Sequence, residues 1–277
     1  MIALDQLSCV ADITRYQSKI NGHRVAQIFE GRETTYADLD YKASQVANGL
    51  IAAGCEPNTR IGYLGKNSDY FFEVMSGTAK ANLVIAGVNW RLAPPEIEYI
   101  LNNACIDILF VGAEFYDVVV QLMPNIGNIR QFIAIDGGHS EWPDYGSWRD
   151  TQDSTDPMLP VSLDDDVMQL YTSGTTGHPK GVQLTNGNYL DVLDQAANGG
   201  WGDWDEGEAS IWLEIEKGFA QNYLDKKPTN IKLVKNPSQN ILPQIAETAV
   251  NLMADGGHYI QLLFSEELKQ FNNLISG

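Results

Sequence analysis

The sequence predicts an α/β fold in which helices flank a mostly parallel β-sheet. Between about residues 34 and 190, segments with helical spacing of apolar residues alternate with short apolar runs rich in β-branched residues. That alternation is typical of parallel strands joined by helices. With 277 residues and a hydrophobic content of 44%, the chain can also bury a large core, and its length is near that at which one domain becomes two.

The first predicted helix of this alternation begins after residue 35. Thr35 and Asp38 have the spacing of a capping box, in which each side chain accepts a hydrogen bond from the backbone of the other. One helical face then carries apolar side chains, and Gly54 suits the end of the helix. These apolar side chains are Leu39, Ala43, Val46, Ala47 and Leu50.

The rest of the alternation continues to about residue 190. Five strands are predicted, at residues 61–64, 83–88, 106–111, 129–135 and 167–171. Helices are predicted at residues 69–79, from Pro94 onward, at residues 114–123 and from near Gly187. Residues 137–160 are rich in Pro, Asp, Ser and Trp, so they predict an irregular segment before the last strand.

Charge and cysteine content exclude several classes of protein. The chain has 36 acidic and 18 basic residues, and its formal charge of −18 would repel nucleic acids and anionic membranes. Cys9, Cys55 and Cys105 are odd in number and far apart, which predicts neither disulfides nor a zinc site. No apolar run has the length of a transmembrane segment and no signal peptide is recognisable, so a cytoplasmic location is expected.

The most informative segment is Tyr-Thr-Ser-Gly-Thr-Thr-Gly-His-Pro-Lys-Gly at residues 171–181. Its glycines allow the backbone to approach a ligand, its hydroxyls can donate to phosphate oxygens, and Lys180 supplies a positive charge. The spacing is not that of a Walker loop, because Gly181 follows the lysine where Ser or Thr would stand. The segment predicts a polyphosphate site, most simply for ATP; the alternative is a polar surface turn.

The surroundings of this segment fit a phosphate site. The predicted strand at residues 167–171 leads directly into it, and Thr185 or Asn186 can cap a helix that begins near Gly187. The expected order is therefore strand, loop, helix. Because ligands of open α/β sheets bind at the carboxyl ends of the strands, the loop is expected at that edge.

The segment resembles the phosphate loop of the adenylate-forming enzymes, which include the acyl-CoA synthetases. Further similarity to the amino-terminal half of acid:CoA ligases lies at residues 33–40, 47–50, 66–69, 87–96 and 108–111, and the resemblance covers about residues 10–195. It implies that hydroxyls hold the β- and γ-phosphates of ATP, that glycines permit close approach, and that Lys180 balances pyrophosphate. The residues concerned are Thr172, Ser173, Gly174, Thr175, Thr176, Gly177 and Lys180.

The resemblance implies a reaction as well. A fatty or aryl carboxylic acid would attack ATP to give an acyl-adenylate, and CoA would then accept the acyl group. Mg²⁺ is expected to accompany the nucleotide in so acidic a protein. No metal site within the chain is predicted, and the catalytic residues are unknown.

The resemblance ends near residue 197, which predicts two parts: residues 1–197 and an unassigned tail, residues 198–277, with its own α/β pattern. The later motifs of the family are not found in the tail, so a truncated chain that is inactive alone is expected. A catalytically silent interaction module, whose tail contacts a protein partner, and a gene-model fragment are the alternatives. The acidic residues 203–208 are interpreted as a solvated charged run.

Overall fold

The computed structural model describes residues 7–172 and 179–198, except for the side chains of residues 193–198. By its internal contacts the chain divides into Ile2–Asp191 and a second unit, Val192–Gly277 together with Met1. The first unit contains both sheets and helices α1–α6, and the fold is described for that unit.

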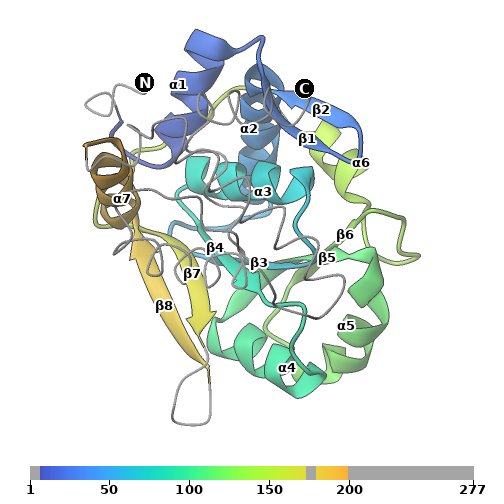
Figure 1. The fold of residues 1–277 in the computed structure, drawn as a ribbon. Coiled ribbons are helices and arrows are strands. Elements are labelled where there is room, and N and C mark those ends of the chain that lie inside the picture. Colours follow the sequence, from blue (N-terminus) through green and yellow to red (C-terminus); the bar gives the residue numbers. More distant parts are fainter. Residues whose placement is uncertain (1–6, 173–178, 199–277) are drawn as a thin grey trace, which may run out of the picture. The chain divides into compact units, whose positions relative to one another are not determined.

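A six-stranded sheet forms the centre of the first unit, with strand order β6-β5-β3-β4-β7-β8 (Figure 1). Neighbours pair in parallel from β6 through to β7, and only β8 is antiparallel to its neighbour β7. The predicted α/β fold with a mostly parallel sheet is thus confirmed. The strands are β3 (Arg60–Leu64), β4 (Val84–Val88), β5 (Ile106–Gly112), β6 (Gln131–Ile135), β7 (Asp166–Thr172) and β8 (Lys180–Thr185).

The strand β8 corrects the predicted order of strand, loop and helix. A second strand follows the loop segment, and helix α7 (Asn186–Asn198) begins only after it. Residues 180–183 of β8 are exposed, and the strand lacks the apolar pattern from which the buried strands were predicted. For this reason β8 was not predicted. The cap is as predicted: the Thr185 hydroxyl accepts a hydrogen bond from the Asn188 N–H at 3.2 Å.

Two layers of helices cover the sheet (Figure 1). The helices α1 (Ala11–Asn21), α2 (Tyr36–Ala52), α3 (Asp69–Lys80) and α6 (Tyr145–Asp150) form one layer. The other contains α4 (Pro94–Asn103) and α5 (Tyr116–Leu122), which is flanked by short 3₁₀ turns at Ala113–Phe115 and Met123–Asn125. The capping box at α2 is confirmed, with the Asp38 N–H 3.1 Å from the Thr35 hydroxyl.

Besides β8, four elements lie where no element was predicted. The antiparallel pair β1 (Val25–Phe29) and β2 (Arg32–Thr35) turns at Glu30 and Gly31, whose φ angles are 49° and 80°. Such a turn matches the twist of a hairpin. Helix α1 precedes the hairpin, and helix α6 lies within the segment predicted to be irregular, where the Asp144 carboxylate caps it through the Ser147 N–H.

The core is continuous on both faces of the central strands. Phe110 of β5 lies edge-on to Tyr145 and Trp148 of α6, with ring centroids 5.8 and 5.7 Å apart. On the α4 and α5 face, buried residues of β3, β4 and β5 pack against both helices. The strands contribute Leu64, Val88, Leu109 and Val111, and the helices contribute Ile97, Ile100, Leu101 and Val119. Among the described helices, none is long and apolar enough to span a bilayer.

Candidate functional site

The carboxyl ends of the parallel strands meet at one edge of the sheet, and the phosphate-loop segment leaves β7 at that edge. In the register of β7 and β8, Thr172 pairs with Lys180, so the two ends of the segment lie side by side. Both residues are exposed to solvent. The sheet therefore presents a hydroxyl and a lysine from adjacent strands at the edge where α/β proteins bind ligands.

Of the seven predicted site residues, the structure places two. Thr172 is the last residue of β7 and Lys180 the first of β8. Ser173, Gly174, Thr175, Thr176 and Gly177 lie outside the described residues. Their predicted contacts to phosphate stay a prediction, as do the roles of Thr172 and Lys180.

The side chains at the base of the loop form a hydrogen-bonded group. Tyr171 donates its hydroxyl hydrogen to Asn103 Oδ1 at 2.6 Å, and it accepts a hydrogen bond from Gln169 Nε2 at 3.1 Å. Burial raises the pKa of the Tyr171 hydroxyl, which therefore stays protonated and can donate. Gly181 lies opposite Tyr171 in the β7–β8 register.

Sequence reasoning assigned no role to two further cations at this edge. Lys66 follows β3 by two residues, and its Nζ lies 2.6 Å from Glu114, which follows β5. Arg91 follows β4, and its guanidinium carbon lies 4.6 Å from the centroid of the Trp90 ring, over which Lys66 also lies at 5.6 Å. A basic residue just after a parallel strand is the signal that could have found them.

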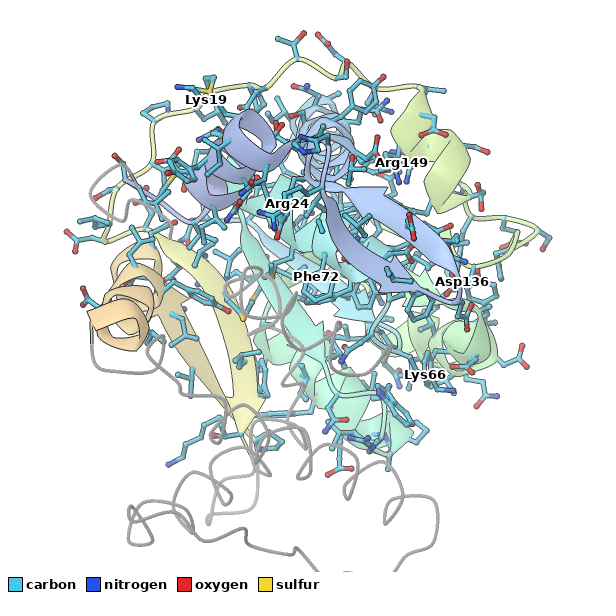
Figure 2. The ribbon with its side chains drawn as sticks, turned by 45° about the horizontal axis from the view of Figure 1, so that its top comes forward. Lys19, Arg24, Lys66, Phe72, Asp136 and Arg149 are labelled. Carbon is cyan, nitrogen blue, oxygen red and sulfur yellow. The ribbon has the colours of Figure 1, made fainter. Side chains whose placement is uncertain are left out.

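Figure 2 shows Lys66 on the same side of the molecule as Asp136, which follows β6. Burial raises the pKa of Asp136, and the neighbouring carboxylates of Asp69, Glu30 and Glu114 add to this effect, against an opposing effect of Arg32. The edge thus carries both signs of charge, and its cations follow β3, β4 and the loop segment.

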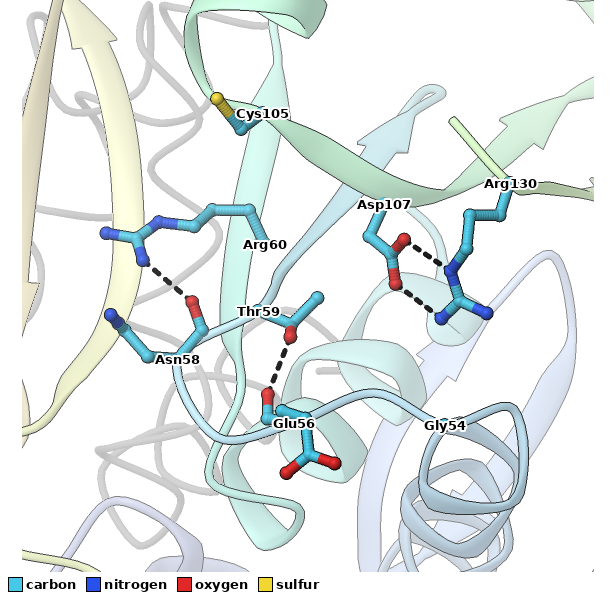
Figure 3. A pocket seen from close by; sticks show the side chains of 8 residues that line it. All are labelled: Gly54, Glu56, Asn58, Thr59, Arg60, Cys105, Asp107 and Arg130. Atoms are coloured by element: carbon cyan, nitrogen blue, oxygen red, sulfur yellow. Dashed lines mark hydrogen bonds and ion pairs between the residues drawn. The ribbon is translucent and has the colours of Figure 1, made fainter. Parts of the chain in front are cut away.

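A pocket of about 460 Å³ lies at the opposite edge, where β3 and β5 begin (Figure 3). Its two guanidinium groups are already paired: Arg130 with both oxygens of Asp107, and Arg60 with Asp166 at 3.1 Å. A carboxylate thus offsets the charge of each guanidinium in this pocket. The pocket is lined by Gly54, Glu56, Asn58, Thr59, Arg60, Cys105, Asp107 and Arg130.

Comparison with known proteins identifies the family of the chain. Residues 15–213 match the model of the AMP-binding enzyme family, and the chain belongs to that family. The match includes every strand of the central sheet and the complete loop segment, and it extends beyond residue 197, where the resemblance was predicted to end.

Several curated relatives are similar to this chain over part of their length. The chain is 36% identical over 209 residues to the fatty acid–[acyl-carrier-protein] ligase ScoC of Streptomyces coeruleorubidus, covering 74% of this chain and 39% of that one. It is 33% identical over 172 residues to feruloyl-CoA synthase of an Amycolatopsis species, covering 62% and 32% respectively. The chain thus spans about two fifths or less of the length of these relatives.

A solved structure is also similar to this chain over part of its length. The anthranilate CoA ligase AuaEII, crystallised with anthranoyl-AMP, superposes with a TM-score of 0.65 at 26% identity. The superposition covers 73% of this chain and 39% of that one.

Proposed function

We propose that the protein takes part in the ATP-dependent activation of a carboxylic acid, with the segment between Thr172 and Lys180 as the polyphosphate site. The observation that carries the proposal is the pairing of these two residues at the carboxyl edge of a sheet in an AMP-binding family member. That pairing brings a hydroxyl donor and a cation to the two ends of a glycine-rich segment, as a polyanion requires.

The proposed reaction forms an acyl-adenylate. A carboxylate oxygen of the acid attacks the α-phosphorus of ATP, the bond to the bridging oxygen breaks, and pyrophosphate leaves with the electron pair. The acyl group then passes from AMP to a thiol, which we propose to be that of CoA. Lys180 would offset the charge that develops on the leaving pyrophosphate, which is the main requirement of such a transfer.

The substrate class is a fatty or aryl acid. By their names, the relatives above are a fatty acid ligase, a feruloyl-CoA synthase and an anthranilate CoA ligase. Each name refers to a carboxylic acid or to its CoA ester. Within the described residues, no group of three or more His, Cys, Asp and Glu side chains could hold a metal ion. We propose that Mg²⁺ arrives bound to the phosphates of ATP, because Mg²⁺ at nucleotide sites is usually held by one or two carboxylates together with the substrate phosphates.

Binding of Mg-ATP is the first test, by titration calorimetry on the full chain. We expect saturable binding that Lys180→Ala weakens about tenfold or more, because a charge-assisted contact to phosphate is lost. Lys19→Ala is the matched control, since Lys19 is also an exposed lysine and lies on α1. If the unchanged chain releases no heat, the nucleotide site is wrong.

Turnover is tested separately, by pyrophosphate exchange over a panel of fatty and aromatic acids. Exchange that depends on the acid and on Lys180 supports an acid-activating enzyme. Binding of Mg-ATP without exchange supports the second candidate, a nucleotide-binding module without catalysis.

A further inference from the structure

We infer that Tyr171 and Gln169 are positioning residues: their hydrogen bonds hold β7 to α4 and β3, and β8 packs against them at Gly181, the residue next to Lys180. The inference rests on the proposed function only in that the loop so held is taken to bind phosphate. Neither residue is among the predicted contacts to the nucleotide.

The side chains of Gln169 and Tyr171 lie on one face of β7. The two residues are two apart, and side chains at that spacing project to the same side of a strand. The Gln169 side chain is buried, and both of its polar atoms are used: Nε2 donates to the Tyr171 hydroxyl at 3.1 Å, and Oε1 accepts from Arg60 Nε at 3.2 Å.

Further hydrogen bonds anchor Gln169 and Tyr171 to neighbouring elements. The Tyr171 hydroxyl donates to Asn103 Oδ1 at 2.6 Å, at the last residue of α4. At the other end Arg60 donates to Asp166 Oδ2 at 3.1 Å and to the Asn58 carbonyl at 2.7 Å. We call these four side chains, Asn103, Tyr171, Gln169 and Arg60, the β7 hydrogen-bond chain. It ties the loop-bearing strand to α4 and β3.

Strand β8 approaches these two side chains closely at Gly181. A Cβ atom built on Gly181 would lie 2.6 Å from Gln169 Nε2 and 3.1 Å from Tyr171 Cζ. The separation of 2.6 Å is far shorter than van der Waals contact, so a larger residue at this position would displace the Gln169 amide from its hydrogen-bond partners or push β8 away. Because Gly181 pairs with Tyr171, the neighbouring pair of Thr172 and Lys180 is held in the same register.

The two ends of the loop are held at a fixed separation before any ligand arrives, which lowers the entropy lost when a polyanion binds there. Loss of the Tyr171 hydroxyl would loosen the ends of β7 and β8, whereas the Tyr171 ring would still pack against the core and the rest of the sheet would stay folded.

The decisive test is amide hydrogen exchange without ligand, followed by mass spectrometry of peptides. In Tyr171→Phe we expect exchange to be about fivefold faster in peptides that contain residues 170–172 and 180–182, because about one hydrogen bond's free energy is lost. Peptides from α2 should not change. Tyr41→Phe, an exposed tyrosine on α2, is the matched control.

Variants of Asn103 separate the hydrogen bond from simple packing. Asn103→Leu removes one of the two hydrogen bonds of the Tyr171 hydroxyl and should reproduce part of the local effect of Tyr171→Phe, whereas Asn103→Asp keeps an acceptor and should retain protection. The double variant that combines Asn103→Leu with Tyr171→Phe should exchange no faster than Tyr171→Phe alone, because that substitution already removes the bond to Asn103. Unchanged exchange in Tyr171→Phe, or faster exchange throughout the sheet, would overturn the inference.

Affinity for Mg-ATP gives the second readout. Tyr171→Phe should weaken binding about fivefold with no change in the far-ultraviolet circular dichroism spectrum, and Asn103→Asp should bind like the unchanged chain. If the unchanged chain does not bind Mg-ATP, the proposed function fails, while hydrogen exchange still decides the positioning role. If it binds and Tyr171→Phe binds equally well, the positioning role is rejected and the nucleotide site stands.

Discussion

Lys80 Nζ lies 2.6 Å from Asp156 Oδ2, although the lysine side chain has no exposed surface. The same nitrogen lies 2.6 Å from Asp40 Oδ1 and donates to the Ser44 hydroxyl at 3.0 Å. Arg15 of α1 pairs with the other oxygen of Asp156 at 2.8 Å. This cluster joins α1, α2 and α3 to the segment that leads from α6 to β7.

Replacement of this lysine should destabilise the protein strongly. Lys80→Met keeps most of the side-chain volume but leaves the Asp40 carboxylate without this cation and Asp156 with Arg15 alone, and we expect a loss of about 3 kcal/mol in the free energy of unfolding. Urea denaturation followed by circular dichroism measures it. Lys19→Met, at an exposed site, should change stability by less than about 0.5 kcal/mol. Equal effects of the two variants would contradict the role given to the cluster.

Asp156 should make stability depend on pH in the acid range. Burial alone raises the pKa of its carboxyl, but hydrogen bonds from Arg15 and Lys80 outweigh burial and bring the pKa well below the ordinary 3.8. The unfolded state then binds the proton more readily, so this contribution to stability is complete above about pH 5 and declines as the pH falls below about 4.

The variant Asp156→Asn removes that titration. It should be less stable than the unchanged protein at pH 7, and its stability should fall less between pH 5 and pH 3. Urea denaturation at several pH values gives both slopes. Asp164→Asn, an exposed carboxylate in the same segment, is the control and should leave the slope as it is. Parallel slopes for Asp156→Asn and the unchanged protein would refute the assignment.

Gly77 allows α3 to pack closely on α2. A Cβ atom there would lie 2.5 Å from Val46 Cβ and 2.8 Å from the carbonyl oxygen of Ala43. Since a backbone atom cannot move aside, Gly77→Ala should cost about 1 to 3 kcal/mol despite the better helix propensity of alanine. Thermal denaturation measures the loss. Gly127→Ala, with nothing within 4 Å, should have little effect, and a loss as large there would remove the steric explanation.

Thiol chemistry should distinguish two of the cysteines. Burial raises the pKa of the Cys55 thiol to about 11, and the neighbouring Asp107 carboxylate adds to this effect. At pH 8 only about one Cys55 in a thousand is then a thiolate, whereas Cys105 is exposed. Ellman's reagent should modify Cys105 first, and Cys105→Ser should remove the rapid phase. A rapid reaction at Cys55 in the folded protein would show that its environment is not as described.

Much of the fold could be predicted from local sequence. The five parallel strands and the helix capped by Thr35 and Asp38 were predicted because apolar periodicity and capping residues are local signals. The family was recognised from residues 171–181 and the shorter motifs before them, and the match over residues 15–213 confirms it. The division at residues 197 and 198 stays a prediction.

Other elements were missed because their signals are weak or not local. Strands β1 and β2 are short and largely exposed, and the Glu30-Gly31 turn was the one clue to their hairpin. Helix α6 has only six residues, too few to be stable alone, and it forms because Arg149 pairs with the buried Glu73 at 2.6 Å.

The sequence by itself determined the class of fold, the family and the segment proposed to hold phosphate, because each depends on residues that are close together along the chain. Only the tertiary structure decided the strand order and the pairing of Lys180 with Thr172. It alone showed that Asn103 and Arg60, 68 and 109 residues from their partners in β7, hold the base of the loop. Such contacts depend on which distant segments pack together, and no local pattern specifies that.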